Sequence, residues 1–395
     1  MHDHPRHPAV ALTDGAFYAN DPHPHFDWLR EHAPLYWDEA GQVWGVTRYA
    51  DVLALSKDPQ TFCSGGGIRP DQPPMPYMVD LDDPAHKQRR GLVSRGFTPR
   101  RVQEHEPRIR EISAGLIEAA QARGRFDFVT DVAAWLPLIV IGDMLGVDPD
   151  DHARLLAWSE AMIMGNGATT AEQLLQAAAA FDEYIDYQRQ VIADRRAYPR
   201  EDLVSILVHA EIDGARLNDD ELLMESLLIL IGGDETTRHV LSGGMYELLR
   251  HPDQLRALAR DPSGIPVSVE EMLRWVSPIQ NMARSATRDV ELHGQRIDAG
   301  QKVLLLYPAA NRDAGVFRDP HRFDSKRAPN DHLAFGIGAH FCLGANLARL
   351  ELRVFFEELL RRTPDLTLAS TDPPPRRPSN FICGIEHLPV EWRAS

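Results

Sequence analysis

The sequence predicts a mainly α-helical protein with small β-sheets. Apolar residues recur at helical spacing through most of the chain, and the longest such pattern runs over residues 218–250. Shorter stretches rich in β-branched and aromatic residues, divided by turns, occur at residues 33–48, 279–306 and 379–392. No segment with the composition of a linker divides the sequence, so we expect a single domain over residues 1–395. Within it, these stretches are expected to form a smaller β-rich region.

The composition is that of an ordinary globular protein, with 43% hydrophobic and 25% charged residues. A formal net charge of -16 disfavours non-specific binding to nucleic acid or to an anionic membrane surface. The three cysteines, Cys63, Cys342 and Cys383, are widely spaced, and no apolar leader is recognised. We therefore expect a reducing, cytoplasmic environment without disulfides. No apolar run approaches the ~20 residues that cross a bilayer, so we expect a soluble protein.

The first hundred residues mix short elements with one long loop. The pattern predicts a helix at 26–32, a hairpin at 35–47 and a short helix from Asp51. Between residues 63 and 84, glycines and prolines forbid a continuous helix. A loop of that length is a lid or binding loop, or else a disordered link. We favour a substrate-covering loop and assign to an apolar substrate wall its residues Ile68, Met75 and Met78.

A helix is expected directly after Asp83-Pro84, and it carries His86 and Arg90 four residues apart on one face. Such a cationic pair is usually solvated, although both side chains are good donors to a carboxylate. The next segments show helical spacing with a break at Gly165-Asn166-Gly167. Their helices are expected at residues 102–122, 131–145, 148–162 and 170–196.

The longest predicted helix begins with a capping box formed by Asn218 and Glu221. At ~1.5 Å per residue it is about 48 Å long, so much of it must be buried. Its middle holds the segment Gly232-Gly233-Asp234-Glu235-Thr236. Two adjacent glycines weaken a helix by roughly 1 kcal/mol each, and two acids follow in apolar surroundings. Two explanations of this segment stay open. The glycines could allow close helix packing while an acid pairs with Arg238, or the segment could form a functional turn.

A glycine-rich loop carries one cysteine: Phe335-Gly336-Ile337-Gly338-Ala339-His340-Phe341-Cys342-Leu343-Gly344. It runs into a predicted amphipathic helix from Leu343 to about Leu360. The N–H groups and dipole of a helix N-terminus favour an anion, which lowers a cysteine pKa and supplies the thiolate that binds metals. The glycines would let the backbone turn tightly and approach a flat ligand. A buried cysteine in a tight loop is the alternative.

These two segments resemble motifs of the cytochrome P-450 family. The spacing F-G-x-G-x-H-x-C-x-G resembles its haem-binding loop, and G-G-x-E-T-T resembles its oxygen-activation motif. The resemblance covers essentially the whole chain and implies the cytochrome P-450 fold, with haem between the long central helix and the cysteine-loop helix. It implies that Cys342 is the metal ligand and that the haem loop includes Phe335, Gly336 and Gly344. The expected partners of the haem propionates are His86, Arg90, Arg284 and His340.

The same resemblance assigns roles within the long helix. Thr236 would hold bound oxygen by a hydrogen bond in a widened helical turn. Glu235 would relay protons, with Asp234 as the weaker candidate for that role. We assign to the substrate wall, together with the residues of the long loop, Leu228, Ile231 and Gly232.

Two further groups of residues are expected away from the oxygen site. In the resembled family a Glu-x-x-Arg pair, here Glu271 and Arg274, is joined by an arginine of a later segment, here Arg322. An acidic redox partner would need a basic landing surface on this acidic protein. The candidates, which could equally be solvated helix faces, are Lys87, Arg89, Arg100, Arg101, Arg349 and Arg353.

Residues 66–73, 228–239 and 332–335 resemble more closely the bacterial steroid side-chain hydroxylases, which oxidise the terminal methyl (C26/C27) of cholesterol and cholest-4-en-3-one. We therefore expect a haem-thiolate monooxygenase that uses haem b, O₂ and two electrons from NAD(P)H. No flavin or nicotinamide fingerprint is recognised, which implies ferredoxin and ferredoxin reductase partners. A monooxygenase of another lipid, such as a fatty acid or terpene, and a non-enzymatic haem or gas-binding protein are the alternatives.

Overall fold

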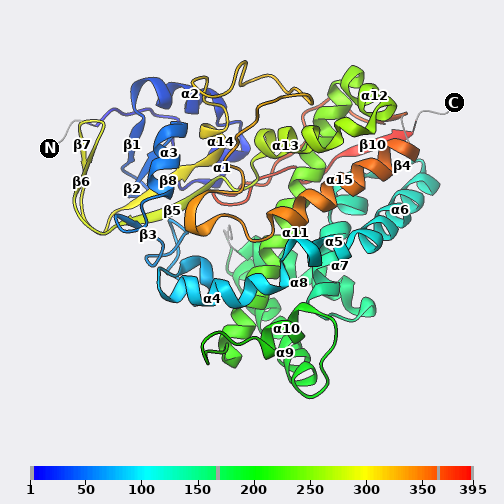
Figure 1. The fold of residues 1–395 in the computed structure, drawn as a ribbon. Helices are drawn as coiled ribbons and strands as arrows, with labels where there is room; N and C mark the ends of the chain where they lie inside the picture. The colour runs from blue at the N-terminus through cyan, green and yellow to red at the C-terminus, as the bar shows by residue number, and fades with distance from the viewer. Residues whose placement is uncertain (1–3, 166–169, 363–364, 393–395) are drawn as a thin grey trace. The chain divides into compact units, whose positions relative to one another are not determined.

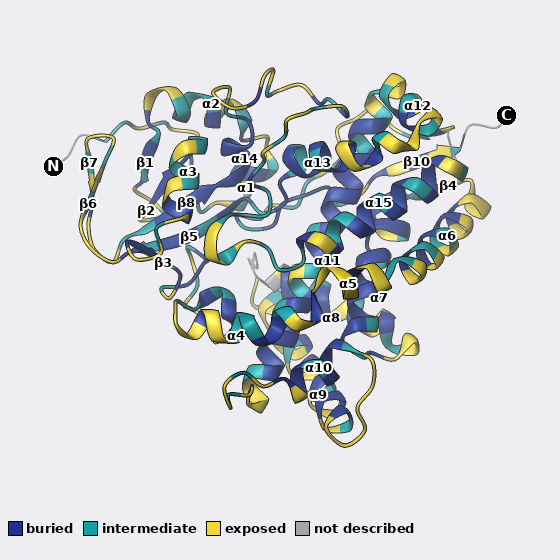
Figure 2. Ribbon diagram, viewed as in Figure 1, coloured by how far each residue is buried: buried dark blue, intermediate teal, exposed yellow. Residues whose placement is uncertain are grey.

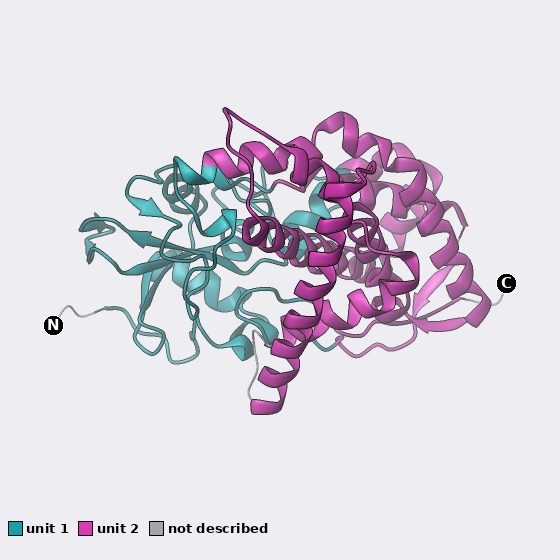
Figure 3. Ribbon diagram, turned by 90° about the horizontal axis from the view of Figure 1, so that it is seen from below, with its two compact units in different colours: residues 1–86, 267–342, 375–384 teal, residues 87–266, 343–374, 385–395 magenta. Residues whose placement is uncertain are grey.

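The computed structural model of the protein describes residues 4–165, 170–362 and 365–392 (Figure 1). The chain divides into two compact units, which Figure 3 distinguishes by colour. The first unit consists of residues 1–86, 267–342 and 375–384, and the second of residues 87–266, 343–374 and 385–395. Each unit is therefore assembled from segments that lie far apart in the sequence. The expectation of a single domain stays a prediction.

The first unit is built on a five-stranded sheet in the order β1-β2-β8-β5-β3, with β2 and β8 parallel and the other neighbours antiparallel. Its strands are β1 Leu35–Asp38, β2 Val43–Val46, β3 Phe62–Cys63, β5 Asn281–Ala286 and β8 Lys302–Leu306. A separate hairpin pairs β6 (Val290–Leu292) with β7 (Gln295–Ile297). The strands predicted within residues 33–48 and 279–306 are thus confirmed.

Alternate residues of β8 enter two apolar clusters, as the two-residue period of a strand requires. Leu304 and Leu306 pack with residues of α1 (Gly15–Ala19) and α2 (His23–His32). Val303 and Leu305 instead pack with residues of α3 (Tyr49–Ser56). Helices α13 (Ile265–Val276) and α14 (Tyr307–Ala310) also belong mainly to this unit, whereas most of α4 (Ala85–Val93) belongs to the second unit.

The second unit is mainly helical. Helix α8 packs against α9, α6 against α15, and α7 and α15 against α11. Its helices are α5 Pro99–Glu104, α6 Glu106–Arg123, α7 Trp135–Met144, α8 His152–Gly165, α9 Ala171–Ala197, α10 Leu203–His209, α11 Asp219–Arg250, α12 Pro252–Arg260 and α15 Ala345–Arg362. The predicted helix over residues 102–122 is divided at His105, because Pro107 opens a new helix. The predicted break at Gly165-Asn166-Gly167 falls largely outside the described residues.

Helix α11 confirms the predicted length and start of the long helix. The Asn218 side chain accepts from the Glu221 N–H at 3.0 Å, and the Glu221 carboxylate accepts from the Asn218 N–H at 3.0 Å. Most of the helix is buried, as the dark blue of Figure 2 shows. No helix among the described residues is both long and apolar enough to cross a membrane.

Residues 379–392, which were expected in the same β-rich region as the other two stretches, contain a single strand. Strand β10 (Pro389–Trp392) instead pairs with β4 (Arg125–Asp127) and β9 (Leu366–Leu368) in the second unit. In the first unit, Ile382 makes only an isolated bridge to Ile279. Strands of three residues are too short for periodicity to reveal, and β4 lies more than two hundred residues before its partner.

Candidate functional site

The cysteine loop is closed by a backbone hydrogen bond, in which the Cys342 N–H donates to the Phe335 carbonyl at 2.9 Å. Gly336 and Gly338 adopt positive φ angles of 63° and 81°. A Cβ atom on Gly338 would lie 2.5 Å from the carbonyl oxygen of the last residue of α3, so only glycine fits there. Helix α15 begins at Ala345, two residues later than predicted, which leaves Cys342 just ahead of its first turn.

His340 of this loop lies against His86, and their ring centroids are 4.0 Å apart. His340 Nε2 is 3.2 Å from Ser64 Oγ, and His86 Nδ1 is 3.2 Å from Asp83 Oδ1. Ring N–H groups of two neighbouring imidazoles can both donate to an anionic group. The structure thus brings His86 and His340 together, and Arg90 follows His86 by one turn of α4. Ser64 was not anticipated from the sequence.

Arg284 on β5 is buried, with 5% of its surface exposed, and makes no ion pair with any described residue. Its Nη1 donates at 2.8 Å to the carbonyl of the adjacent Ala283. A buried guanidinium without a counter-ion is costly, and its planar donor fork matches a carboxylate. Gly344, in the same haem loop sequence, has no atom within 4 Å of the position of an added Cβ. His86, His340 and Arg284, all in the first unit, supply donors that suit carboxylates such as those of haem.

Helix α11 is buried on most sides, but one stripe in its middle is only partly covered. The stripe follows helical spacing and consists of Leu228, Ile231, Gly232 and Thr236. A Cβ atom on Gly232 would meet no atom within 4 Å, whereas one on Gly233 would lie 2.6 Å from the Ile141 side chain of α7. Gly233 therefore permits close helix packing, and Gly232 borders open space.

The Thr236 hydroxyl donates to the Gly232 carbonyl at 2.8 Å. Helix α11 continues through these residues without interruption. The widened turn expected here is therefore not seen, because the threonine hydroxyl bonds back to the preceding turn without breaking the helix.

Glu235 is fully buried, and Arg238 and His239 of its own helix lie close to its carboxylate. Its Oε1 lies 3.2 Å from Arg238 Nη1, and its Oε2 lies 3.3 Å from His239 Nε2. The same Arg238 nitrogen is 3.1 Å from the carboxylate of Glu160 on α8, whose side chain is 42% exposed. The ion pair to Arg238 considered from the sequence is thus present, and it links Glu235 to the surface.

Asp234 is fully buried as well, but it has a different environment. Its Oδ2 accepts from the Ser159 hydroxyl of α8 at 2.8 Å, while its Oδ1 has no hydrogen-bond partner among the described residues. Burial, and then the neighbouring Glu235 carboxylate, raise the pKa of Asp234 to about 8. Asp234 therefore carries a proton nearer to neutral pH than an ordinary aspartate. Neither Ser159 nor this difference between the two acids was evident from the sequence.

Two side chains that the sequence did not indicate form hydrogen bonds to the backbone of the predicted substrate loop. Asp80, which is 4% exposed, accepts from the N–H groups of Ile68 at 2.9 Å and Met75 at 2.7 Å. Lys302 Nζ of β8 donates to the Arg69 carbonyl at 2.6 Å. Ile68 and Met78 are buried and Met75 is half-buried. The loop is therefore ordered and anchored to the sheet.

The prediction that Arg322 joins the Glu271–Arg274 pair is wrong. Glu271 and Arg274 are fully buried and their side chains meet at 2.7 Å, as expected. Arg327 supplies the third side chain, with its Nε 3.0 Å from Glu271 Oε2. The Arg322 side chain is exposed, and only its backbone carbonyl accepts a hydrogen bond from Arg274. At this turn the neighbouring Phe323 side chain is the one that is buried.

The predicted basic landing surface is smaller than expected. Arg89 forms ion pairs with Glu221 and Glu225, and Arg353 forms ion pairs with Glu106 and Glu357. These arginines are committed to contacts between helices of the second unit. Arg100 also has a partner on its own helix, Glu104, at 3.2 Å. The surface available to a redox partner is reduced accordingly.

Comparisons with known proteins agree with this geometry. Residues 163–261 and 266–390 match the cytochrome P450 family model. The chain is 50% identical over 391 residues to the steroid C26-monooxygenase of Mycobacterium tuberculosis (strain H37Rv), covering 98% of each chain. It is 41% identical to the methyl-branched lipid omega-hydroxylase of the same organism, covering 96% of this chain and 91% of the other.

Among solved structures, CYP109E1 from Bacillus megaterium in complex with corticosterone superimposes with a TM-score of 0.88. It is 32% identical to this chain, and the alignment covers 95% of this chain and 100% of the other. This similarity confirms the predicted mainly α fold with small sheets. The chain therefore belongs to the cytochrome P450 family, whose members bind haem through a cysteine thiolate and use O₂.

Proposed function

We propose that this protein hydroxylates the terminal methyl (C26/C27) of a cholesterol-type steroid side chain. The observation that carries the proposal is the 50% identity over 98% of the chain to a steroid C26-monooxygenase. The partly covered apolar stripe of α11 supports it, because an aliphatic side chain requires an apolar wall. The 41% identity to a methyl-branched lipid omega-hydroxylase makes another branched lipid the second candidate.

The haem group in this proposal is haem b, with the Cys342 thiolate as its axial ligand. A thiolate ligand supplies electron density that favours cleavage of the O–O bond. Phe335, Gly336 and Gly344 shape the loop around that ligand. The groups that would hold the propionates are His86, Arg90, Arg284 and His340. Arg284 gives the strongest support, because its guanidinium is buried and has no ion-pair partner among the described residues.

The α11 stripe supplies the oxygen and substrate contacts in this proposal. The Thr236 hydroxyl, which donates to the Gly232 carbonyl, is the group that would donate a hydrogen bond to O₂ in the haem pocket. The absence of a side chain at Gly232 keeps that position open. The substrate wall consists of Ile68, Met75, Met78, Leu228, Ile231 and Gly232. Glu235 would relay protons to the pocket, with Asp234 as the weaker candidate for that role.

Electrons come from NAD(P)H through a ferredoxin reductase and a ferredoxin, and the reaction takes place in the cytoplasm. Members of the family generally use redox partners and hydrophobic substrates. An acidic ferredoxin would be attracted by basic groups that remain exposed on the second unit. Lys87 and Arg101 are such groups, since both are exposed in the structure.

Titration of the ferric holoenzyme with cholest-4-en-3-one tests the substrate. We expect the Soret band to shift from the low-spin to the high-spin position, because the steroid displaces water from the haem pocket. A methyl-branched fatty acid serves as the comparison ligand. A shift with the fatty acid alone would replace the steroid assignment by the second candidate. Cys342→Ser is expected to abolish the red-shifted Soret band of the reduced CO complex, which checks the ligand independently of the substrate.

A further inference from the structure

The three residues of the long loop that we assign to the substrate wall are all connected to one side chain, Asp80. Asp80 Oδ1 accepts from the Ile68 N–H at 2.9 Å, and Asp80 Oδ2 accepts from the Met75 N–H at 2.7 Å. Met78 begins the short 3₁₀ turn Met78–Asp80, which carries Asp80 itself. One carboxylate therefore sets the positions of the three wall residues relative to one another.

The geometry requires a carboxylate at this position. Each Asp80 oxygen accepts from a different part of the loop, one at residue 68 and the other at residue 75. An asparagine would offer one acceptor and one NH₂ group, and the NH₂ group would face a backbone N–H. Asp80 is 4% exposed, so little water is available to replace a lost acceptor. The amide would thus leave one of the two N–H groups without its partner.

The first half of the loop is attached to the sheet of the first unit independently of Asp80. The Ala283 N–H of β5 donates to the Ile68 carbonyl at 2.8 Å. The Arg69 guanidinium lies 4.3 Å from the ring centroid of Phe381, and its carbonyl accepts from Lys302 of β8. Asp80 is consequently the group that connects the second half of the loop, with Met75, to the part that the sheet already holds.

The charged groups around Asp80 come from both neighbouring strands and from the loop. Lys302 on β8 and Arg284 on β5 favour its ionised form, as do the two backbone N–H groups. Burial acts in the opposite direction and outweighs them, so the pKa of Asp80 lies above its ordinary value. The positive charge of Arg69 is also coupled to Asp80. Asp80 is thus a buried acceptor inside the fold and not a solvated surface charge.

We propose that Asp80 is a positioning residue that holds the loop wall in one shape and thereby favours a rigid steroid over a flexible lipid chain. A wall that already has its bound shape loses no conformational freedom on binding, so a ligand of fixed shape gains most from it. A flexible chain adapts to a wall that moves and depends less on its being fixed. This inference rests on the proposed function, because it takes the loop residues to contact the substrate.

Hydrogen–deuterium exchange of the ferric holoenzyme tests the anchor without any ligand. We expect Asp80→Asn to raise amide exchange over residues 68–80 about tenfold, because the loss of a buried hydrogen bond makes local opening easier. The red-shifted Soret band of the reduced CO complex should be unchanged, which shows that the variant folds around haem. Unchanged exchange over residues 68–80 would overturn the anchor.

Asp38→Asn is the matched control. Asp38 is also 4% exposed, and its Oδ2 accepts from the Leu12 N–H at 2.6 Å. Its Oδ1 accepts from the N–H groups of Ala40 and Gly41, both at 3.1 Å. It therefore makes the same kind of backbone contacts at β1, away from the proposed substrate wall. Its substitution should raise exchange near residues 12 and 40 and leave residues 68–80 unchanged.

Spin-shift titrations test the consequence for the ligand. We expect Asp80→Asn to weaken the binding of cholest-4-en-3-one about tenfold, and that of a saturated methyl-branched fatty acid less than about threefold. Asp38→Asn should change both affinities by less than about twofold, which separates wall geometry from a general loss of stability. Equal weakening of the two ligands by Asp80→Asn, or an unchanged steroid affinity, would overturn the positioning role.

Failure of this inference is distinguishable from failure of the proposed function. If the wild type shows no spin shift with the steroid, the substrate assignment and the preference for a rigid steroid both fall. The exchange measurement still decides whether Asp80 holds the loop. If the wild type shows the shift and Asp80→Asn binds the steroid equally well, the substrate assignment stands and the role of Asp80 is overturned.

Discussion

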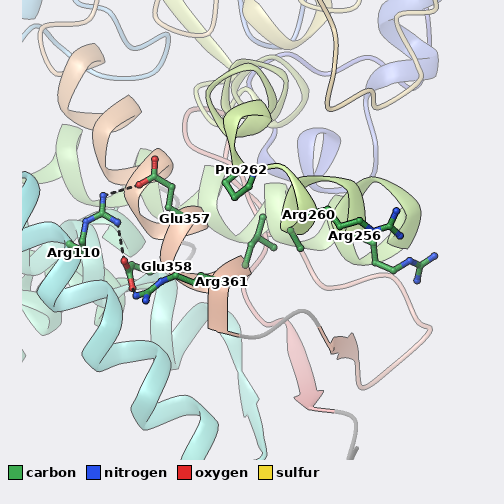
Figure 4. Close-up of a pocket in the computed structure, with 9 residues that line it drawn as sticks. Arg110, Arg256, Arg260, Pro262, Glu357, Glu358 and Arg361 are labelled. Atoms are coloured by element: carbon green, nitrogen blue, oxygen red, sulfur yellow. Dashed lines mark hydrogen bonds and ion pairs between the residues drawn. The ribbon is translucent and has the colours of Figure 1, made fainter.

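Glu351 and Glu358 lie two turns apart on α15, and both are buried, with 1% and 2% of their surfaces exposed. Glu351 has no ion-pair partner among the described residues, and burial raises its pKa well above the ordinary value. Burial acts in the same direction on Glu358, but hydrogen bonds from Arg110, Arg361 and Arg362 outweigh it and lower the pKa to about 2. Figure 4 shows Arg110 and Arg361 around Glu358.

Burial therefore does not decide the charge of a carboxyl group on this helix. Near its amino-terminal end, α15 faces Asp234 of α11, which adds a negative charge. Near its carboxy-terminal end, it faces α6, which supplies Arg110. The first arrangement raises the pKa of Glu351, and the second holds Glu358 in an ion-pair network. One helix thus carries two buried glutamates whose charge states are set by different neighbouring helices.

The largest effect is expected for Glu358→Gln. The substitution removes the charge-assisted hydrogen bonds to three arginines, and we expect a loss of about 2 kcal/mol at neutral pH, because the arginines remain partly solvated. The lowered pKa means that this stabilisation is complete above the ordinary pKa and disappears as the pH falls through about 2. Urea denaturation of wild type and variant at pH 7 and at low pH measures both. Equal midpoints at pH 7 would contradict the ionised network.

A smaller effect of opposite pH dependence is expected for Glu351→Gln. Because the pKa of Glu351 is raised, the wild type loses stability as the pH rises above the ordinary glutamate range. The amide does not titrate, so the variant should gain stability relative to wild type as the pH rises above the ordinary glutamate range, by up to about 1.4 kcal/mol per pH unit. Thermal midpoints across that range provide the measurement. A constant difference would show that Glu351 does not titrate there.

The smallest effect is expected from a double-mutant cycle of Asp234→Asn with Glu351→Gln. At high pH, where both acids are ionised in the wild type, we expect a coupling of about 0.5–1 kcal/mol from like-charge repulsion. The coupling should vanish at low pH, where both acids are protonated. The matched cycle of Glu351→Gln with Glu358→Gln should be additive to within about 0.5 kcal/mol, because two helical turns separate the residues. A larger coupling energy between Glu351→Gln and Glu358→Gln would show that the two glutamates of α15 do not respond to separate surroundings.

Local sequence patterns were sufficient for the elements whose determinants are close in the chain. The capping box of α11 needs only Asn218 and Glu221, and the cysteine loop needs only its glycines and one turn of following helix. The Glu271–Arg274 pair is likewise local to one helix. Its third member could not be found in this way, because the loop that returns Arg327 to Glu271 has no periodicity.

The amino-acid sequence by itself determined the family motifs, the helical architecture and the identity of the residues proposed to hold haem. Only the tertiary structure decided which of its buried acids are paired. Asp234 and Glu235 are adjacent in the chain, yet one turns toward Ser159 and the other toward Arg238 and His239. Glu351 joins them from a helix more than a hundred residues away. A pKa depends on burial and on charges that arrive from distant segments, so no local pattern could reveal it.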